Sequence, residues 1–229
     1  MSTGPILNDM LPRPSTRDLL RSLPALTGDL PEVDPYALPA DPVDAFQDWF
    51  AAAVAAGVPE PHALCLSTVG PDGAPHARVV LLADVADGAW VFASDARAGK
   101  AQDLAAEPRA ALTFYWQPLG RQVRVTGRAR ALDAATCAAD FLRRSPSARA
   151  AAFASRPGER LLSAAELHAA VQQARARVDR EPGLVLPTWQ LWAVEPDEVE
   201  LWQGDSDRAH VRVRYVRSDD RWDRHLDWP

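Results

Sequence analysis

The chain has 229 residues, of which 47% are hydrophobic and 24% charged, as is ordinary for a globular protein that buries a sizeable core. Its formal net charge of −6 excludes a protein whose general surface field attracts nucleic acid or anionic lipid. Any bound anion must therefore be held by a local group of cations.

The first residues, MSTGPILNDMLPRPS, do not show a basic region followed by a long apolar run, and no stretch of about 18 apolar residues occurs. We therefore expect a cytoplasmic protein that does not span a membrane. Cys65 and Cys137 lie far apart in segments with regular patterning, so we expect two reduced thiols. No Cys/His cluster has metal-ligand spacing, and we expect no metal.

Residues 1–40 are rich in proline and have little periodicity, which predicts an arm on the surface rather than a domain. The first helix is predicted over DPVDAFQDWFAAAVAAG, with Asp41 as N-cap, Pro42 in the first turn and Gly57 at the end. Its buried face is predicted from the helical spacing of Phe46, Trp49, Phe50 and Ala53.

The apolar period then changes to two, which predicts strands over 62–69, 77–84, 89–94, 110–116 and 121–132. The connections contain GPDG, ADG and QPLG, which are typical of turns. Short links favour antiparallel neighbours, so we expect a meander that curls into a barrel. Residues 41–229 are predicted to form a single domain.

Two helices are predicted to follow. Asp133 can cap AATCAADFLRR, and Ser163 with Glu166 forms a capping box before a helix. The predicted apolar face of that second helix consists of Leu167, Val171, Ala174 and Val178. The chain ends in the predicted strands WQLWAV, EVELWQG, HVRVRYV and RWDRHL.

Two cations stand near the predicted strand pair RVVLLADVADGAWVFAS. Arg78 opens the first strand, and Lys100 follows the second at the start of the short helix AQDLAAEP. Cations beside the free N–H groups of a helix N-terminus suit a phosphate. A solvated surface role for both residues is the alternative on these grounds alone.

The order of segments resembles the pyridoxine/pyridoxamine 5′-phosphate oxidase family, the FMN-binding split barrels. The resemblance runs from about residue 40 to the C-terminus, and it rests on the blocks RVVLL, VFAS, GKA, EPRAALTFYW, GRQVRVTGRA, ELWQG and RAHVR. It implies a mainly β fold with helices, an antiparallel split β-barrel flanked by helices, and a homodimer that holds FMN at its interface.

The resemblance also implies roles for individual residues. Arg78 and Lys100 would bind the FMN phosphate and ribityl chain, and Ser94 would hydrogen-bond to the cofactor. The backbone of Val79, Val80, Leu81 and Leu82 would lie beside the flavin. Gln122, Trp202 and Arg212 would complete the cofactor site. Arg144, Arg208 and His210 would contact the substrate, with Arg208 orienting an anionic group and His210 as an acid/base candidate.

The chain departs from the family pattern where the pyridoxal phosphate-forming enzymes bind the substrate phosphate. Ala83 replaces a lysine, and Asp140 and Ala148 replace a tyrosine and a serine, so that only Arg144 remains. On the flavin side, Gly99 stands in place of Arg or Gln, and Pro157 and Gly158 in place of a Gln-Ser pair. The departures predict that the FMN site is kept and the substrate-phosphate site is lost.

The chain also resembles the flavin oxidases of phenazine biosynthesis in three segments. These are LPADPVDAFQDWF, FLRRSPSARAAAFASRPGE and the ending RYVRSDDRWDRHLDWP. We therefore expect an FMN-dependent oxidase that takes a hydride from a reduced aromatic-ring substrate without a phosphate and uses O2. Three alternatives remain open: a pyridoxine/pyridoxamine 5′-phosphate oxidase, a deazaflavin-dependent reductase, and a non-catalytic flavin-binding dimer.

Overall fold

The structure is a computed structural model that describes residues 15–229, so residues 1–14 of the predicted arm lie outside the described residues. The elements in chain order are α1 (Thr16–Ser22), α2 (Pro42–Ala55), β1 (Ala63–Val69), β2 (Pro75–Ala86), β3 (Ala89–Asp95), α3 (Gly99–Ala106), β4 (Arg109–Trp116), β5 (Arg121–Ala131), α4 (Ala134–Arg143), α5 (Pro146–Ala154), α6 (Ala164–Arg180), β6 (Trp189–Gln203), β7 (Val211–Ser218) and β8 (Arg221–Leu226). A short 3₁₀ turn, Gln117–Leu119, links β4 to β5.

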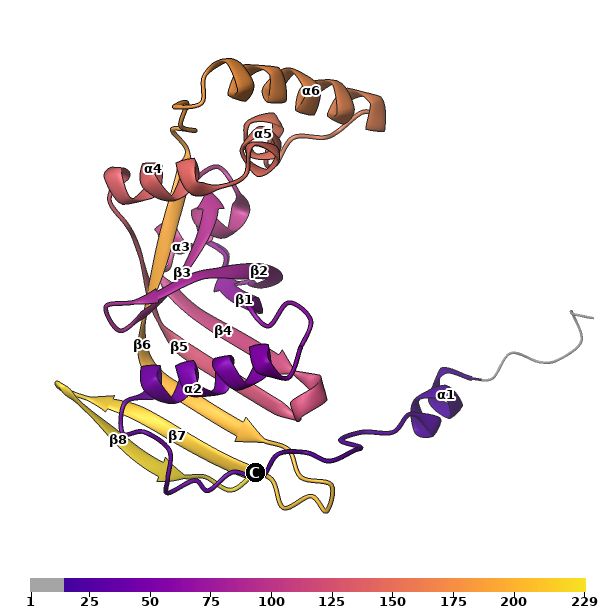
Figure 1. Cartoon of the computed structure of the whole chain (residues 1–229), viewed down its shortest axis with the longest axis vertical. Helices are drawn as coiled ribbons and strands as arrows, with labels where there is room; N and C mark the ends of the chain where they lie inside the picture. The colour runs from indigo at the N-terminus through magenta and orange to yellow at the C-terminus, as the bar shows by residue number, and fades with distance from the viewer. Residues whose placement is uncertain (1–14) are drawn as a thin grey trace, which may run out of the picture.

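The strands form one antiparallel sheet in the order β3-β2-β1-β4-β5-β6-β7-β8. An additional pairing between β3 and β6 closes the first six strands into a barrel, and β7 and β8 continue the sheet beyond it. Figure 1 shows this extension at the end opposite to α5 and α6. The predicted antiparallel barrel flanked by helices is therefore confirmed.

The prediction of a simple meander was wrong at one step. Strands β1, β2 and β3 follow one another in the sheet, but β4 pairs with β1 and not with β3. The connection is not a tight turn, because α3 carries the chain from β3 to the far side of β1. The segments WQLWAV and EVELWQG are a single strand, β6, which runs through Pro196.

Alternation of buried and exposed residues along the strands builds the barrel interior. Leu64, Leu66, Leu112, Phe114, Val123, Val125, Val199 and Leu201 are buried inside it. Helix α2 adds Phe46, Trp49 and Ala53 to the same core, as its spacing predicted, while Phe50 is only partly buried. The Asp41 carboxylate accepts a hydrogen bond from the N–H of Val43, which confirms the N-cap.

The arm N-terminal to α2 contacts the barrel over its second half. The hydroxyl of Tyr215 donates to the carbonyl of Pro39 at 2.9 Å, and Val33 and Leu38 pack against the core. In contrast, α1 buries none of its residues. We propose that residues 1–40 are an arm and that residues 41–229 form the domain.

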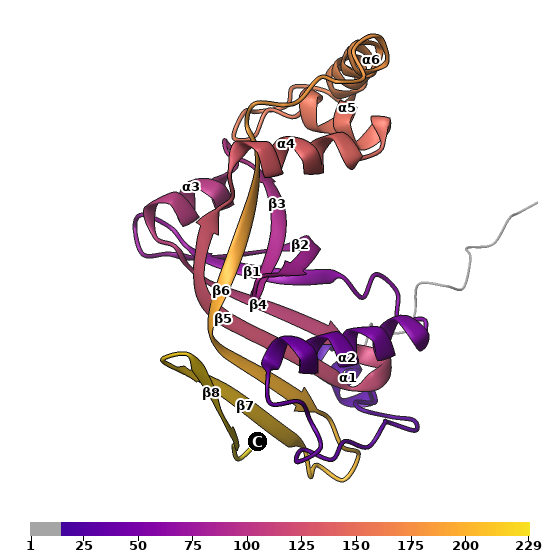
Figure 2. The same cartoon turned by 60° about the vertical axis from the view of Figure 1, so that its left-hand side comes forward.

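Three helices, not two, separate β5 from β6. Helix α4 packs against β6, with Asp133 as its N-cap, whereas α5 and α6 pack mainly on each other (Figure 2). The side chain of Ser163 caps α6, but Glu166 accepts from Leu162 and so completes the predicted capping box only in part. Ala174 and Val178 are buried, whereas Leu167 is exposed. No helix within residues 15–229 is long and apolar enough to cross a membrane.

Gly127 permits the close pairing of β5 with β6 at the bulge beside Pro196. A Cβ at position 127 would overlap the backbone carbonyl of Glu195 and would lie 2.8 Å from the Cα of Pro196. We expect Gly127→Ala to lower the free energy of unfolding by about 1–3 kcal/mol, because the backbone has to move apart. Urea denaturation measures the change.

Gly183→Ala is the matched control, since a Cβ there meets nothing within 4 Å. We expect it to change the free energy of unfolding by less than about 0.5 kcal/mol. Equal effects of the two substitutions would contradict the tight approach of β5 to β6.

Candidate active site

Arg78 and Lys100 belong to neighbouring elements at one end of the barrel. Arg78 lies on β2 and donates from Nη1 to the hydroxyl of Thr68 at 2.7 Å. Lys100 lies in the first turn of α3, and its pKa is lowered by burial and by the positive charge of Arg78. Both elements pack against β1, so the two predicted cations lie on neighbouring elements.

The N-terminus of α3 adds free donors to this pair. Ala98 is the N-cap residue and offers no side-chain hydrogen bond, so the first backbone N–H groups of the helix are not capped by a side chain. A Cβ at Gly99 would meet nothing within 4 Å, so the backbone is open to an approaching group. Two cations and an uncapped helix N-terminus suit a phosphate group.

Sequence reasoning missed the residues behind Arg78. Asp103, on α3, is 4% exposed and accepts hydrogen bonds from the Thr68 hydroxyl at 2.7 Å and from Nδ1 of His76 at 3.0 Å. Burial opposes ionisation of Asp103, but these hydrogen bonds and the charges of His76 and Arg78 prevail and lower its pKa. The only signal in the sequence is the position of Asp103 one turn after Lys100.

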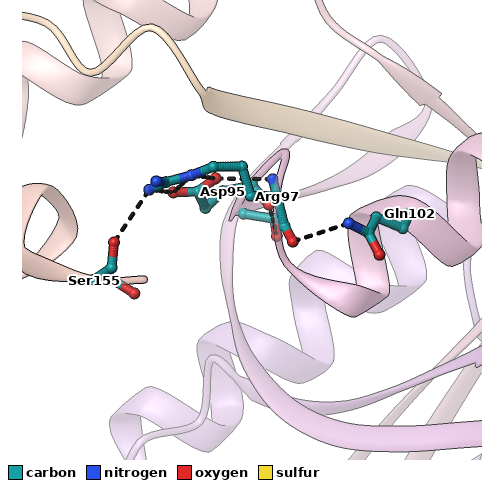
Figure 3. A network of polar contacts seen from close by, with 5 residues as sticks. Asp95, Arg97, Gln102 and Ser155 are labelled. Atoms are coloured by element: carbon teal, nitrogen blue, oxygen red, sulfur yellow. Dashed lines mark hydrogen bonds and ion pairs between the residues drawn. The ribbon is translucent and has the colours of Figure 1, made fainter. Parts of the chain in front are cut away.

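A second contact ties the loop after β3 to the end of α5. Figure 3 shows Arg97 between Asp95 and Ser155. Nη2 of Arg97 lies 2.6 Å from the Asp95 carboxylate and donates to the carbonyl of Ser155 at 3.1 Å. Gln102 in turn donates to the carbonyl of Arg97. Arg97 therefore connects the segment just before Gly99 with the segment that contains Pro157 and Gly158.

The other predicted residues near Arg78 differ in burial. Ser94 is buried, and its hydroxyl donates to the carbonyl of Asp95. On β2, Val80 and Leu82 pack against the core, whereas Val79 and Leu81 are 71% and 49% exposed on the outer face. The outer face of β2 is therefore exposed at Val79 and Leu81, whereas Arg78 is in phase with the inward-facing Val80 and Leu82.

Gln122, Trp202 and Arg212 form a row across three strands. Gln122 of β5 pairs with Trp202 of β6, which pairs with Arg212 of β7. The structure therefore brings these three predicted residues together, as the sequence could not. Each of them is directly adjacent along its strand to a buried residue, Val123, Leu201 or Val213, and so faces outward from the barrel.

A buried carboxylate lies next to this row. Glu200 is 1% exposed and has Arg212 at 3.5 Å, Arg124 at 3.6 Å and Arg214 at 4.0 Å. Its negative charge offsets part of the mutual repulsion of the three guanidinium groups. Arg212 also donates to the carbonyl of Trp228 near the C-terminus.

Arg208 and His210 lie in the loop that joins β6 to β7. The backbone N–H of Asp205 donates to Nδ1 of His210 at 3.0 Å, and the imidazole lies 5.0 Å from the ring of Trp202. Because an N–H can only donate, Nδ1 is the acceptor, and the neutral ring carries its proton on Nε2. Arg208 has a φ of 69°, in the left-handed region that non-glycine residues adopt infrequently.

Arg144 and Asp140 are both engaged with Trp189. The guanidinium carbon of Arg144 lies 4.4 Å from the centre of the indole, and the indole N–H donates to Asp140 at 2.9 Å. The carboxylate of Asp140 therefore has a partner within the protein. Ala83 is the extra residue of a bulge between β2 and β3, and its side chain is exposed.

The site residues thus fall into two groups. One group, Arg78, Ser94 and Lys100, lies on β2, β3 and α3; the other, Gln122, Trp202, Arg208, His210 and Arg212, lies on β5, β6, β7 and the loop between the last two. Arg78 pairs with the inward-facing Leu66, whereas Gln122, Trp202 and Arg212 face outward. Arg78 and this row of residues therefore lie on opposite faces of the sheet within one protomer.

Comparison with known proteins agrees with this architecture. The family described as pyridoxamine 5′-phosphate oxidase matches residues 50–203, and the pyridoxine 5′-phosphate oxidase C-terminal dimerisation region matches residues 189–229. A pyridoxine/pyridoxamine 5′-phosphate oxidase of Thermosynechococcus vestitus is 42% identical over 187 residues, covering 80% of this chain and 87% of the relative. One of Bordetella petrii is 43% identical over 177 residues, covering 77% and 83%.

Two solved structures are also similar. PhzG from Burkholderia lata, in complex with tetrahydrophenazine-1-carboxylic acid, has a TM-score of 0.81 and 28% identity, covering 88% of this chain and 100% of that one. A pyridoxamine 5′-phosphate oxidase-related, FMN binding protein of Nostoc punctiforme has a TM-score of 0.68 at 20% identity, covering 80% and 97%, and supports the fold alone.

The closed barrel, the two matching family regions and the relatives above 40% identity lead to one conclusion. The chain belongs to the pyridoxamine 5′-phosphate oxidase family.

Proposed function

We propose that the protein is a homodimeric, FMN-dependent oxidase that takes a hydride from a reduced aromatic-ring substrate without a phosphate. The main support for this proposal is the candidate anion site formed by Arg78, Lys100 and the uncapped N-terminus of α3. The family match and its dimerisation region support the cofactor and the dimer.

The residues of the first group would hold the cofactor. Arg78, Lys100 and the first N–H groups of α3 would bind the phosphate, with Ser94 and the backbone of Val79–Leu82 beside the rest of the molecule. In the partner subunit, the row of Gln122, Trp202 and Arg212 would cover the flavin ring. Bound FMN would supply the redox chemistry, namely a hydride acceptor that O2 can reoxidise with release of hydrogen peroxide.

The substrate end of the site argues against a phosphate ester. Ala83 and Ala148 provide no donor, and Trp189 engages both Asp140 and Arg144. Each lost charge-assisted hydrogen bond removes about 1.5–3 kcal/mol, so the loss of three donors would weaken phosphate binding by several powers of ten.

The loop between β6 and β7 would recognise the substrate instead. Arg208 would pair with an anionic group such as a carboxylate. The fixed orientation of His210 presents Nε2–H as a hydrogen-bond donor to an acceptor on the substrate, because Asp205 already occupies Nδ1. The similarity to PhzG, which was solved with a tricyclic carboxylic acid, supports a substrate of that class.

A second candidate is the oxidation of pyridoxine or pyridoxamine 5′-phosphate. The names of the relatives that are 42% and 43% identical favour it, and Arg144 is retained. In that case Arg144 would have to leave Trp189 to reach the phosphate.

Turnover separates the two candidates. We expect the FMN-loaded protein to consume O2 with dihydrophenazine or tetrahydrophenazine carboxylic acids, and to oxidise pyridoxine 5′-phosphate at least about 100-fold more slowly in kcat/KM. Oxygen uptake and the absorbance of the product measure both reactions. Faster oxidation of pyridoxine 5′-phosphate would refute the proposed substrate class.

Arg208→Met tests the role of the loop in the same assay. We expect kcat/KM for the carboxylic acid to fall about 10–100-fold while the FMN content is unchanged, because the lost contact is to the substrate. Arg221→Met, an exposed arginine on β8, is the control and should leave kcat/KM unchanged.

Lys100 is the only lysine of the chain, so its titration can be followed directly. Burial and the charge of Arg78 lower its pKa, and we therefore expect the pH midpoint of its acylation rate to lie below that of an exposed lysine. Mass spectrometry of the protein after timed labelling measures the rate at each pH.

The reference is Arg221→Lys combined with Lys100→Arg, which places a single lysine at an exposed position. FMN should protect Lys100 from the reagent and leave the lysine at position 221 reactive. Equal midpoints without FMN would contradict the environment of Lys100, and a lack of protection would contradict its contact with the cofactor.

A further inference from the structure

The position of the Asp103 carboxylate is energetically unfavourable. Its side chain is buried, although a carboxylate loses favourable hydration there. It also lies in the second half of the eight-residue helix α3, where the helix dipole disfavours negative charge. A carboxylate next to an anion site further repels the anion. Three unfavourable effects at one residue require a compensating role.

Three donors surround the Asp103 carboxylate, and all three approach Oδ2. The Thr68 hydroxyl is at 2.7 Å, Nδ1 of His76 at 3.0 Å and Nη2 of Arg78 at 3.6 Å. The lowered pKa of Asp103 means that it is ionised at neutral pH and can only accept. Asp103 thus links its own helix, α3, to Thr68 on β1 and to His76 and Arg78 on β2.

The Thr68 hydroxyl connects the carboxylate with the guanidinium group. It donates to Asp103, and it accepts from Nη1 of Arg78 at 2.7 Å. Nη1 also approaches the carbonyl of Leu66 at 3.5 Å. Because Thr68 has one hydroxyl proton, its donation to Asp103 leaves its lone pairs for Arg78 and fixes the direction of that hydrogen bond. Arg78 is therefore held at Nη1 by Thr68 and at Nη2 by Asp103.

We propose that Asp103 is a positioning residue which, through Thr68, holds the Arg78 guanidinium in the orientation that binds the phosphate of the cofactor. This inference rests on the proposed function, because it assigns Asp103 a role in the same anion site. Asp103 does not touch the ligand in this arrangement. Its effect reaches the phosphate through Arg78 alone.

Replacement of Asp103 changes phosphate binding in opposite directions under its two possible roles. If Asp103 acted only through its charge, its removal would relieve repulsion and tighten the binding of a phosphate. If Asp103 positions Arg78, its removal frees a flexible side chain, and the ordering of that side chain then opposes binding. The two effects have opposite signs, so the direction of the change decides between them.

Asp103→Asn is the informative substitution, because the amide keeps the size and one acceptor oxygen but loses the charge. We expect the Kd for FMN to rise about tenfold, and the Kd for riboflavin, which has no phosphate, to change by less than about twofold. Quenching of flavin fluorescence measures both. A general loss of structure would weaken the binding of both ligands alike.

Thr68 provides a second test of the same contact. Thr68→Val removes the hydroxyl and should weaken FMN as Asp103→Asn does, whereas Thr68→Ser keeps the hydroxyl and should bind FMN normally. Glu107→Gln is the matched control, since Glu107 ends the same helix and pairs with Arg109. It should leave the Kd for FMN unchanged.

A double-mutant cycle with Arg78→Met isolates the coupling. If Asp103 acts through Arg78, Asp103→Asn should have no further effect on the Kd for FMN once Arg78 is replaced. Additive effects, or tighter FMN binding by Asp103→Asn alone, would overturn the proposal. Failure of the unchanged protein to bind FMN would instead overturn the proposed function, and that titration is part of the same series.

Discussion

The fold depends on one strand that is shared between three others. Strand β6 pairs with β3 through its first half, with β5 along most of its length, and with β7 through its second half. The first pairing closes the barrel, and the last carries the sheet beyond it. Because side chains alternate along a strand, the register that buries Val199 and Leu201 also turns Glu200 and Trp202 outward.

This register assembles half of the candidate site. Trp202 lies between Gln122 and Arg212 only because β5 and β7 flank the second half of β6. The other half depends on α3, whose uncapped first turn carries Lys100, and on Arg78 near the start of β2. The two halves face different directions in one protomer. The second half of the site lies within or next to the region, residues 189–229, that matches the family's C-terminal dimerisation region.

Positive charge in this acidic protein is concentrated in local clusters at the candidate site. The whole chain is acidic, with a formal net charge of −6, yet each half of the site holds cations with a buried carboxylate behind them. Asp103 accepts from the side chains around Arg78, and Glu200 lies among Arg124, Arg212 and Arg214. In both places the carboxylate reduces repulsion between the protein groups and limits the orientations of the arginines. The substrate end differs, because Arg144 and Asp140 contact Trp189 instead of a free cleft.

Local patterns in the sequence predicted the strands, the caps of α2 and α4, and the face of α2, since neighbouring residues determine these features. The partners of β4 and the continuity of β6 could not be predicted, because they depend on distant residues. A proline usually ends a strand. Pro196 is accommodated within β6 because its partner on β5, Gly127, has no Cβ. Likewise, Thr68 and Asp103 are 35 residues apart, and no local pattern indicates their contact. Family resemblance, not periodicity, indicated Gln122 and Trp202.

The central claim is that each cofactor site combines residues from two subunits, and mixed dimers test it most directly. Arg78→Met and Arg212→Met homodimers should both bind FMN poorly. If the two residues come from different subunits, a mixed dimer has one site with both defects and one intact site, so FMN binding should reappear on mixing and refolding. If both residues serve the same subunit's site, every site in the mixed dimer keeps one defect. No recovery of FMN binding in a verified mixed dimer would contradict the account.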